Sequence, residues 1–236
     1  MSSEKPQAPR KYLLAPGEVV EGLSENKGIY VFDYGGVKRA TVLGLVEASQ
    51  EEANYIPLKG FYFPREGDIV IGLVTSHGAA NWFLDINSPY MGVLSVQDFF
   101  GVKQGGRVPD DPFSYLKIGD YVKAKIVAFD RTRDPVLTVQ DKGLGRVVEG
   151  TVVTVKPVKV PRVIGKKGSM LEILRGSTGC DFFVAVNGRI HITCPNELLQ
   201  EIAIMAIRMI EEQSHLAGLT RRIKEFIEEE RKVRGV

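Results

Sequence analysis

A glycine–aspartate pair that opens an alternating strand occurs twice in the middle of this 236-residue chain. Gly67-Asp68 precedes a run of apolar residues, and Gly119-Asp120 precedes residues 121–127. In that second copy Val122, Ala124 and Ile126 alternate with Tyr121, Lys123 and Lys125. A period of two is the pattern of a β-strand with one buried face. Such a strand needs other strands to cover that face, so this region is predicted to be a β-domain.

Three further short strands are predicted around the two copies, over residues 81–86, 92–96 and 136–139. About five strands in about 80 residues is the count of a small Greek-key barrel of the OB type. Residues 101–115, rich in Gly, Pro and Asp, are predicted to form a long loop inside it. Trp82 shares a face with Leu84 and is therefore predicted to lie in the core.

The N-terminal quarter also reads as short strands separated by turn residues. Residues 29–34 and 40–46 are predicted strands, with a turn at 26–28 between the first of them and the preceding segment. We expect three domains: 1–65 as a β-rich domain, 66–145 as the barrel and 146–236 as a third domain. The predicted fold class is α+β and multidomain.

In the third domain strands and helices alternate in a definite order. A strand at 151–155 precedes one helical turn at 161–164, a Gly-x-x-Gly loop and a helix that Ser169 is predicted to cap. Strands at 182–186 and 189–193 follow, joined by Asn187-Gly188, a strong hairpin signal. Two helices complete the chain, one opened by Pro195 and one over residues 220–234.

The loop Gly165-Lys166-Lys167-Gly168 carries the sharpest chemical signal. Backbone N–H groups and the dipole of the following helix favour an anion there, and glycines allow a sugar-phosphate backbone to approach closely. Residues 146–236 hold 15 basic and 11 acidic side chains, a net charge of +4 within a chain of net charge +2. The alternative is a tight solvated turn with two surface lysines.

Several classes of protein and site are not supported by the composition. The two cysteines, Cys180 and Cys194, make no CxxC pair and are expected to be core thiols. Because they flank the hairpin at 187–188, the sequence leaves open whether they touch. The three histidines are scattered. No metal site, cofactor or catalytic residue is predicted, so the chain is not expected to be an enzyme. Neither a signal peptide nor a membrane span is recognised, and a cytoplasmic location is expected.

Two parts of the sequence resemble known RNA-binding families. The helix and strand order around Gly165 and Gly168 resembles a KH domain of the eukaryotic topology, whose loop clamps single-stranded nucleic acid; Arg162, Lys166 and Lys167 would neutralise phosphates. The barrel region is similar to the RNA-binding domain of ribosomal protein S-one. Position by position, that resemblance implies an RNA patch of Phe83, Ser95 and Asp130 with Arg131 or Arg133. It departs at Ser95, where many members have His, and at Asp134, where a basic residue is expected.

The combination resembles the archaeal exosome cap subunit of the S-one/KH type over nearly the whole chain. The matching segments are Gly67-Asp68-Ile69-Val70-Ile71-Gly72, Asp130-Arg131 with Asp134-Pro135-Val136-Leu137, and residues 157–165. The resemblance implies a non-catalytic subunit, three of which cap a six-membered ring of RNase-PH-like proteins. The cap would recruit single-stranded RNA, with A-rich tails favoured, and pass it through a pore to the phosphorolytic sites. The N-terminal domain would dock on the ring.

Two alternatives remain. The chain could be a nuclease itself, because bacterial polynucleotide phosphorylase carries the same modules, but this chain has no room for that enzyme's catalytic domains. It could instead be a translation or ribosome-assembly factor that uses the same RNA-binding modules.

Overall fold

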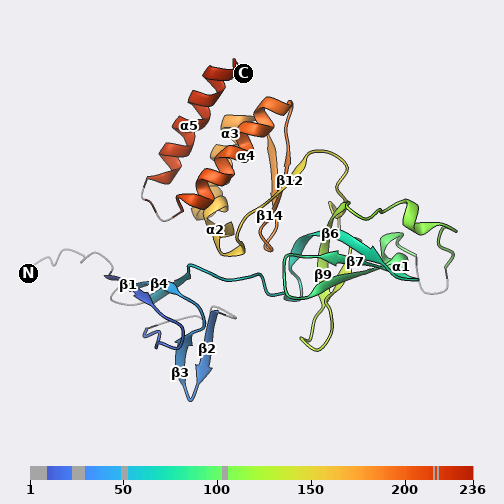
Figure 1. Ribbon diagram of the computed structural model, residues 1–236, viewed down its shortest axis with the longest axis horizontal. Coiled ribbons are helices and arrows are strands. Elements are labelled where there is room, and N and C mark those ends of the chain that lie inside the picture. The colour runs from blue at the N-terminus through green and yellow to red at the C-terminus, as the bar shows by residue number, and fades with distance from the viewer. Residues whose placement is uncertain are drawn as a thin grey trace, which may run out of the picture. The chain divides into compact units, whose positions relative to one another are not determined.

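The structure, a computed structural model, describes residues 10–22, 30–48, 53–102, 106–214, 216 and 218–235. The chain divides into two compact units, Met1–Gly60 and Phe61–Val236 (Figure 1). The second unit contains both a barrel and a helix-covered sheet, each with its own apolar core. The domain boundaries at residues 65 and 145 stay predictions.

The N-terminal unit is made of β-strands, as expected. Its strands are β1 Arg10–Leu14, β2 Val31–Tyr34, β3 Val37–Ala40, β4 Gly44–Ala48 and β5 Ala53–Pro57. They form a three-stranded antiparallel sheet in the order β1-β4-β5 and a separate β2–β3 hairpin. Buried residues Leu14, Val20, Val31, Ala40, Val46 and Tyr55 make its core.

The predicted strand over residues 40–46 is wrong, because this segment joins the end of β3 to the start of β4 through a bend. The phenol of Tyr55 causes the break, since it donates to the Val42 carbonyl and its ring lies against Gly44. A Cβ at Gly44 would lie 2.2 Å from that ring, so a larger residue does not fit there. The turn predicted at residues 26–28 lies outside the described residues.

The predicted barrel is confirmed. Its strands are β6 Ile69–His77, β7 Asn81–Asp85, β8 Met91–Ser95, β9 Tyr121–Ala128 and β10 Val136–Thr138, with β11 Gly145–Arg146 added beside β9. Strand β10 closes the barrel because it pairs in parallel with β8 and antiparallel with β9. A short helix, α1 (Val96–Phe99), follows β8, and a 3-10 turn, Pro112–Ser114, lies in the predicted long loop.

Trp82 lies in the barrel core, as its alternating position predicts. It is fully buried, and its indole N–H donates to the Leu116 carbonyl at 2.9 Å. That hydrogen bond satisfies the one polar atom of the side chain, which would otherwise cost free energy in an apolar interior. The contact also ties the long loop to the strands.

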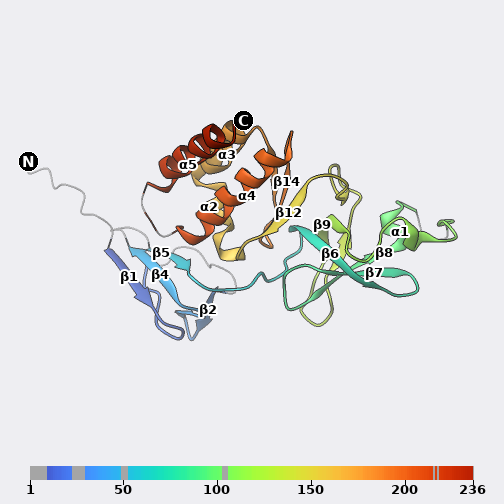
Figure 2. The ribbon, with the colours of Figure 1, turned by 45° about the horizontal axis from the view of Figure 1, so that its top comes forward.

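The C-terminal domain has the predicted order of elements. They are β12 Thr151–Thr154, α2 Val160–Ile164, α3 Ser169–Thr178, β13 Asp181–Val184, β14 Arg189–Thr193, α4 Glu197–Glu212 and α5 Leu219–Arg234, with 3-10 turns at Pro157–Lys159 and Lys166–Gly168. The antiparallel sheet runs β12-β14-β13, and the helices cover one of its faces (Figure 2). In the ranges that the structure describes, no helix is both long and apolar enough to cross a membrane.

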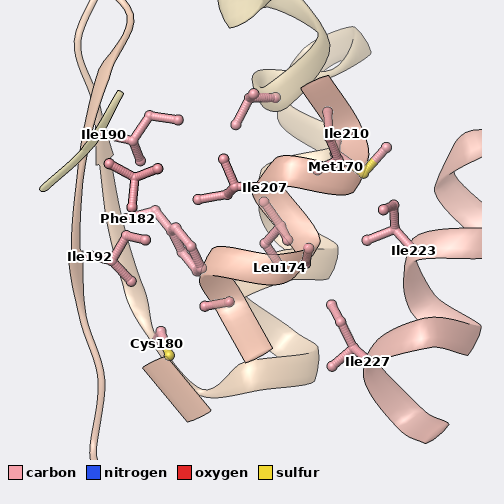
Figure 3. Close-up of a cluster of buried hydrophobic side chains, with 14 of the residues drawn as sticks. Met170, Leu174, Cys180, Phe182, Ile190, Ile192, Ile207, Ile210, Ile223 and Ile227 are labelled. Atoms are coloured by element: carbon pink, nitrogen blue, oxygen red, sulfur yellow. The ribbon is translucent and has the colours of Figure 1, made fainter. Parts of the chain in front are cut away.

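The core of this domain lies between the sheet and the helices. Phe182, Ile190 and Ile192 from the strands face Leu174 of α3 and Ile207 of α4 (Figure 3). Helix α5 covers the outer side of α3 and α4 through Ile223 and Ile227, which are fully buried. The helix predicted over residues 220–234 therefore packs against the domain through one apolar face.

Ser169 does not cap helix α3, contrary to the prediction. The capping position is Gly168, whose φ of 83° is left-handed, and no side chain accepts a hydrogen bond from the first turn. At the start of α4 the cap is Asn196, whose side-chain oxygen accepts from the Leu199 N–H at 2.8 Å.

The expectation of free core thiols is wrong: Cys180 and Cys194 form a disulfide. The pairs Asp181–Thr193 and Phe182–Ile192 set the register of β13 and β14. One step further along, this register places the two cysteines directly opposite each other, with their Cα atoms 4.2 Å apart. The sequence spacing of 14 residues showed no motif because the hairpin, not a local pattern, brings the sulfur atoms together.

Reduction of this disulfide is expected to destabilise the C-terminal domain. A cross-link that closes a loop of about 15 residues stabilises by about 3 kcal/mol, chiefly by restricting the unfolded chain. Thermal unfolding with and without a reductant measures the effect. A variant with both cysteines changed to serine is the control, because reductant should leave its melting temperature unchanged. An equal response of the two proteins would contradict the prediction.

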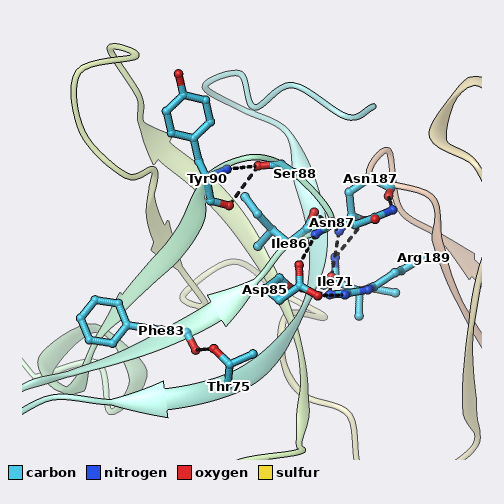
Figure 4. Close-up of polar contacts among 10 residues, drawn as sticks. All are labelled: Ile71, Thr75, Phe83, Asp85, Ile86, Asn87, Ser88, Tyr90, Asn187 and Arg189. Carbon is cyan, nitrogen blue, oxygen red and sulfur yellow. Dashed lines mark hydrogen bonds and ion pairs between the residues drawn. The ribbon is translucent and has the colours of Figure 1, made fainter. Parts of the chain in front are cut away.

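The hairpin turn between β13 and β14 joins the C-terminal domain to the barrel. Asn187, which is fully buried, accepts from the Ile71 N–H at 3.3 Å and donates to the carbonyls of Ile71 and Ile86 at 2.8 and 2.9 Å (Figure 4). The amide of Asn87 in turn donates to the Asn187 carbonyl at 2.7 Å. One side chain thus replaces the partners that these barrel backbone groups would find in water.

Arg189 adds an ion pair to the same contact between the C-terminal domain and the barrel. Its guanidinium lies 2.5 Å from an Asp85 carboxylate oxygen and donates to the Ile71 carbonyl at 3.1 Å. The arginine side chain is only 6% exposed, whereas Asp85 is 40% exposed. Because water reaches Asp85, the attraction between the two charges is partly screened.

The substitution Asn187→Ala is expected to weaken the contact between the C-terminal domain and the barrel. The change leaves the Ile71 N–H and the Ile86 carbonyl without a partner, whereas the Ile71 carbonyl keeps its hydrogen bond from Arg189. We expect a loss of about 2 to 3 kcal/mol in the free energy of unfolding. Chemical denaturation measures it. The matched control is Asn81→Ala, because the Asn81 side chain has no hydrogen bond within the described residues, and its change should stay within about 0.5 kcal/mol. Equal effects of the two variants would refute the assignment.

Candidate nucleic-acid interface

The Gly-x-x-Gly loop is held between two helices. Helix α2 ends at Ile164, and the Gly165 N–H closes it on the Pro161 carbonyl at 2.9 Å. The Gly168 N–H then bonds back to the Gly165 carbonyl at 3.2 Å, and α3 begins at the next residue. The loop is therefore a defined turn with an uncapped helix N-terminus directly behind it.

Both glycines adopt backbone angles that other residues rarely take, with φ of 76° at Gly165 and 83° at Gly168. Their surroundings differ. A Cβ on Gly165 would lie 2.6 Å from the Met170 backbone nitrogen, whereas a Cβ on Gly168 would meet nothing within 4 Å. Lys167 between them is also left-handed, with φ of 53°. Gly165 is required by close packing, and Gly168 by conformation alone.

The basic side chains of this region are available for an anion. Arg162, Lys166 and Lys167 are exposed, and none forms an ion pair within the part of the chain that the structure describes. Behind them, burial lowers the pKa of Lys159, and the nearby charges of Lys156 and Arg162 lower it further. Cations that disfavour one another's charge are stabilised by a phosphate placed between them.

Two of the five predicted barrel residues lie on strands. Phe83 is half-buried on the outer face of β7, where its neighbours Trp82 and Leu84 point inward. Ser95 ends β8 and is the cap of α1, because its hydroxyl oxygen accepts from the Asp98 N–H at 3.0 Å.

The other three predicted residues lie in the loop between β9 and β10. Asp130 organises this loop, since its carboxylate accepts from the Thr132 hydroxyl at 2.8 Å and from the N–H groups of Thr132 and Arg133. These bonds lower the pKa of the Asp130 carboxyl, the Thr132 hydroxyl most of all. Arg133 is exposed, and the guanidinium of Arg131 lies 5.4 Å from the centre of the Phe63 ring.

The structure does not gather these five residues into one cluster. The β9–β10 loop touches the beginning of β8, where Asp134 accepts from the Met91 N–H at 3.2 Å. Ser95 is at the other end of β8, four residues on, or about 13 Å at 3.3 Å per residue. Phe83 pairs with Val93 midway between them. The predicted residues therefore form a strip along the barrel instead of a compact patch.

Sequence reasoning missed an aromatic group beside this loop. Phe63, Tyr90 and Phe129 meet edge to face, with ring centres 4.8 to 5.7 Å apart. Each comes from a different connecting segment, so no alternation or spacing in the sequence indicates that they meet. Arg131 completes the group through its contact with Phe63.

A closed five-stranded barrel followed by the β-α-α-β-β-α order defines the class: a multidomain protein with an OB-type barrel and a KH domain. A KH domain family model matches residues 150–198. The Exosome complex component Rrp4 of Aeropyrum pernix is 55% identical over the full length of both chains. That of Saccharolobus solfataricus is 48% identical over 85% of this chain and 80% of its own.

A solved structure agrees with these relatives. A crystal structure assigned to an exosome complex RNA-binding protein is 59% identical and covers 74% of this chain and 99% of its own, with a TM-score of 0.70. The chain belongs to the Rrp4 family of archaeal exosome components.

The two loop glycines are expected to respond differently to alanine. Gly168→Ala should cost about 1 to 2 kcal/mol, the strain of a left-handed residue with a Cβ. Gly165→Ala should cost more, because its Cβ also collides with the backbone of α3. Thermal unfolding of the two variants measures the difference. A larger loss for Gly168→Ala would show that the loop is not held as described.

Proposed function

We propose that the protein is a non-catalytic RNA-binding subunit that captures single-stranded RNA and delivers it to a phosphorolytic exoribonuclease ring. The observation that carries this proposal is the set of free cations at the Gly-x-x-Gly loop, directly before an uncapped helix N-terminus. Exposed Arg162, Lys166 and Lys167 supply charge, and Gly165 and Gly168 allow the sugar-phosphate backbone to come close.

The barrel supports the proposal in a different way. Phe83 offers an aromatic ring for stacking, which suits any base, and Arg131 and Arg133 lie at the end of the same strip. Ser95 and Asp130 shape the backbone at the two ends of the strip through their hydrogen bonds. In this proposal the KH loop binds phosphates, and the barrel contacts bases.

The N-terminal unit is the proposed docking domain. Its β2–β3 hairpin exposes apolar side chains, with Tyr34 74%, Phe32 41% and Val37 38% exposed. Such a group of apolar side chains on a small hairpin suits a contact with another protein. We propose that three copies cap a hexameric ring of RNase-PH-like subunits in the cytoplasm, favour A-rich tails and surround the pore through which RNA passes. Joining three weak modules raises the effective concentration of RNA.

Replacing Lys166→Asp and Lys167→Asp together tests the phosphate contact. RNA affinity should fall, and the slope of its dependence on salt should decrease by about one for each lost phosphate contact. Fluorescence anisotropy with a labelled single strand at several salt concentrations measures both. The charge-matched control is Arg221→Asp with Lys224→Asp on the exposed side of α5. An unchanged slope in the loop variant would sink the KH part of the proposal.

The same preparation separates the rival functions. A nuclease would degrade labelled RNA in phosphate buffer without other subunits, and that result would refute the non-catalytic role. Pull-down from native extract distinguishes the remaining two: RNase-PH-like subunits support the proposed function, whereas ribosomal subunits support a translation or ribosome-assembly factor.

A further inference from the structure

Three cations lie along the chain between β12 and the Gly-x-x-Gly loop. No acidic residue occurs between Glu149 and Glu172, and that stretch holds five basic side chains, two of which are the loop lysines. The other three are Lys156, Lys159 and Arg162, and we call them the α2 cation row. The proposed function gives a role to Arg162 but none to Lys156 or Lys159.

Helical spacing makes the three cations of the row neighbours. A 3-10 turn runs directly into α2, so residues 157–164 form one helical segment. Lys159 lies three residues after Lys156 and three before Arg162, and side chains three apart on a helix lie next to each other. The row rises about 10 Å over six residues, at about 1.5 to 2.0 Å for each. Lys156 and Arg162 are exposed, and Lys159 between them is half-buried.

No carboxylate neutralises the side chains of the row. The acidic group that acts on it is Glu211 of α4, the helix that packs beside α2 (Figure 2). One Glu211 oxygen accepts from the backbone N–H of Lys156 at 2.8 Å, and the other lies 3.3 Å from the guanidinium of Arg208. Both oxygens thus have partners other than the ammonium groups. Within the described ranges, no side chain of the row forms an ion pair.

Repulsion outweighs attraction at the middle of the row. Burial lowers the pKa of Lys159, and the charges of Lys156 and Arg162 lower it further. Glu211 opposes these effects but is the weakest of the four influences. An anion beside Lys159 would replace repulsion by attraction and stabilise its charged form. The row is therefore a place where an anion is favoured.

The make-up of the row favours a polyanion over a protein partner. The centre of a protein interface is apolar and poor in charged residues. Along the row Pro161 is exposed, but Val160 and Val163 are buried in the domain core. The row thus offers charge without an apolar surface. A nucleic-acid strand carries a phosphate on every nucleotide, which suits cations that follow one another along a line.

We propose that the α2 cation row extends the RNA path beyond the Gly-x-x-Gly loop, with Lys156 and Lys159 contacting phosphates of nucleotides that the loop does not reach. A KH loop holds about four nucleotides, so a strand of that length fills the loop alone. A longer strand also meets the row and is bound more tightly. This inference rests on the proposed RNA binding, and it adds two binding residues and a dependence on strand length.

The double variant Lys156→Gln with Lys159→Gln of the full-length chain tests the proposal. Labelled single strands of about four and about twelve nucleotides, alike in composition, are titrated at several salt concentrations. For the long strand, affinity should fall by about ten-fold. The slope of its salt dependence should decrease by about 1.4, which is about 0.7 for each of two lost phosphate contacts. The short strand should bind the variant as it binds the wild type.

The charge-matched control is Arg221→Gln with Lys224→Gln on α5, where the two side chains are 84% and 59% exposed. It should leave the affinity for both strands unchanged, because exposed charges away from the bound strand are largely screened at physiological salt. Melting temperatures should match the wild type. If the double variant does not fold, Lys156→Gln alone decides, since this exposed residue should account for about 0.7 of the slope.

The outcomes separate this proposal from the proposed function. Equal weakening for the short and the long strand would show that the two lysines act only through general charge, and the extended path would be wrong. If the long strand binds the double variant normally while Lys166→Asp with Lys167→Asp still weakens binding, the row fails and the RNA-binding function stands. If neither set of variants weakens binding, both fail. Normal RNA binding together with loss of a protein partner in pull-down would make the row a protein contact and overturn the proposal.

Discussion

The contact between the barrel and the C-terminal domain is centred on one buried amide, that of Asn187. Asn187 lies in the turn between β13 and β14, where the chain reverses direction. Its side chain forms hydrogen bonds with three backbone groups of the barrel. Buried backbone groups without partners are costly, so this side chain fixes where the hairpin meets the barrel. Arg189, two residues on, adds charge to the same contact. The Gly-x-x-Gly loop and the barrel strip thus belong to one compact unit.

The two candidate RNA contacts use different physics. At the KH loop, exposed cations and a helix N-terminus favour phosphate, which every nucleotide carries. Affinity there is therefore expected to depend strongly on charge and only weakly on base sequence. On the barrel, Phe83 is a half-buried ring on the outer face of β7, which suits stacking with any base.

Much of the fold was predictable because it is written in local patterns. Alternation at residues 121–127 predicted β9, and Asn187-Gly188 predicted the hairpin that joins β13 and β14. The predictions failed where a distant residue decides the backbone. Tyr55 breaks the strand expected over residues 40–46 by bonding the Val42 carbonyl, and strand register places Cys180 opposite Cys194 although their spacing carries no motif. Of the candidate site, the charged loop could be found from its sequence, whereas the group formed by Phe63, Tyr90 and Phe129 could not.

The sequence by itself determined the element types, the barrel and the helix-covered sheet, and the loop of lysines between glycines, since periodicity, turn residues and charge are local properties. Only the tertiary structure showed that Asn187, besides forming the hairpin turn, is buried and bonds the barrel backbone. It also decided that the barrel residues form a strip and that Asn81, Ser95 and Asp111 line one cavity. These facts depend on which strand edges and loops meet in space, and side chains far apart in the chain become neighbours only through packing.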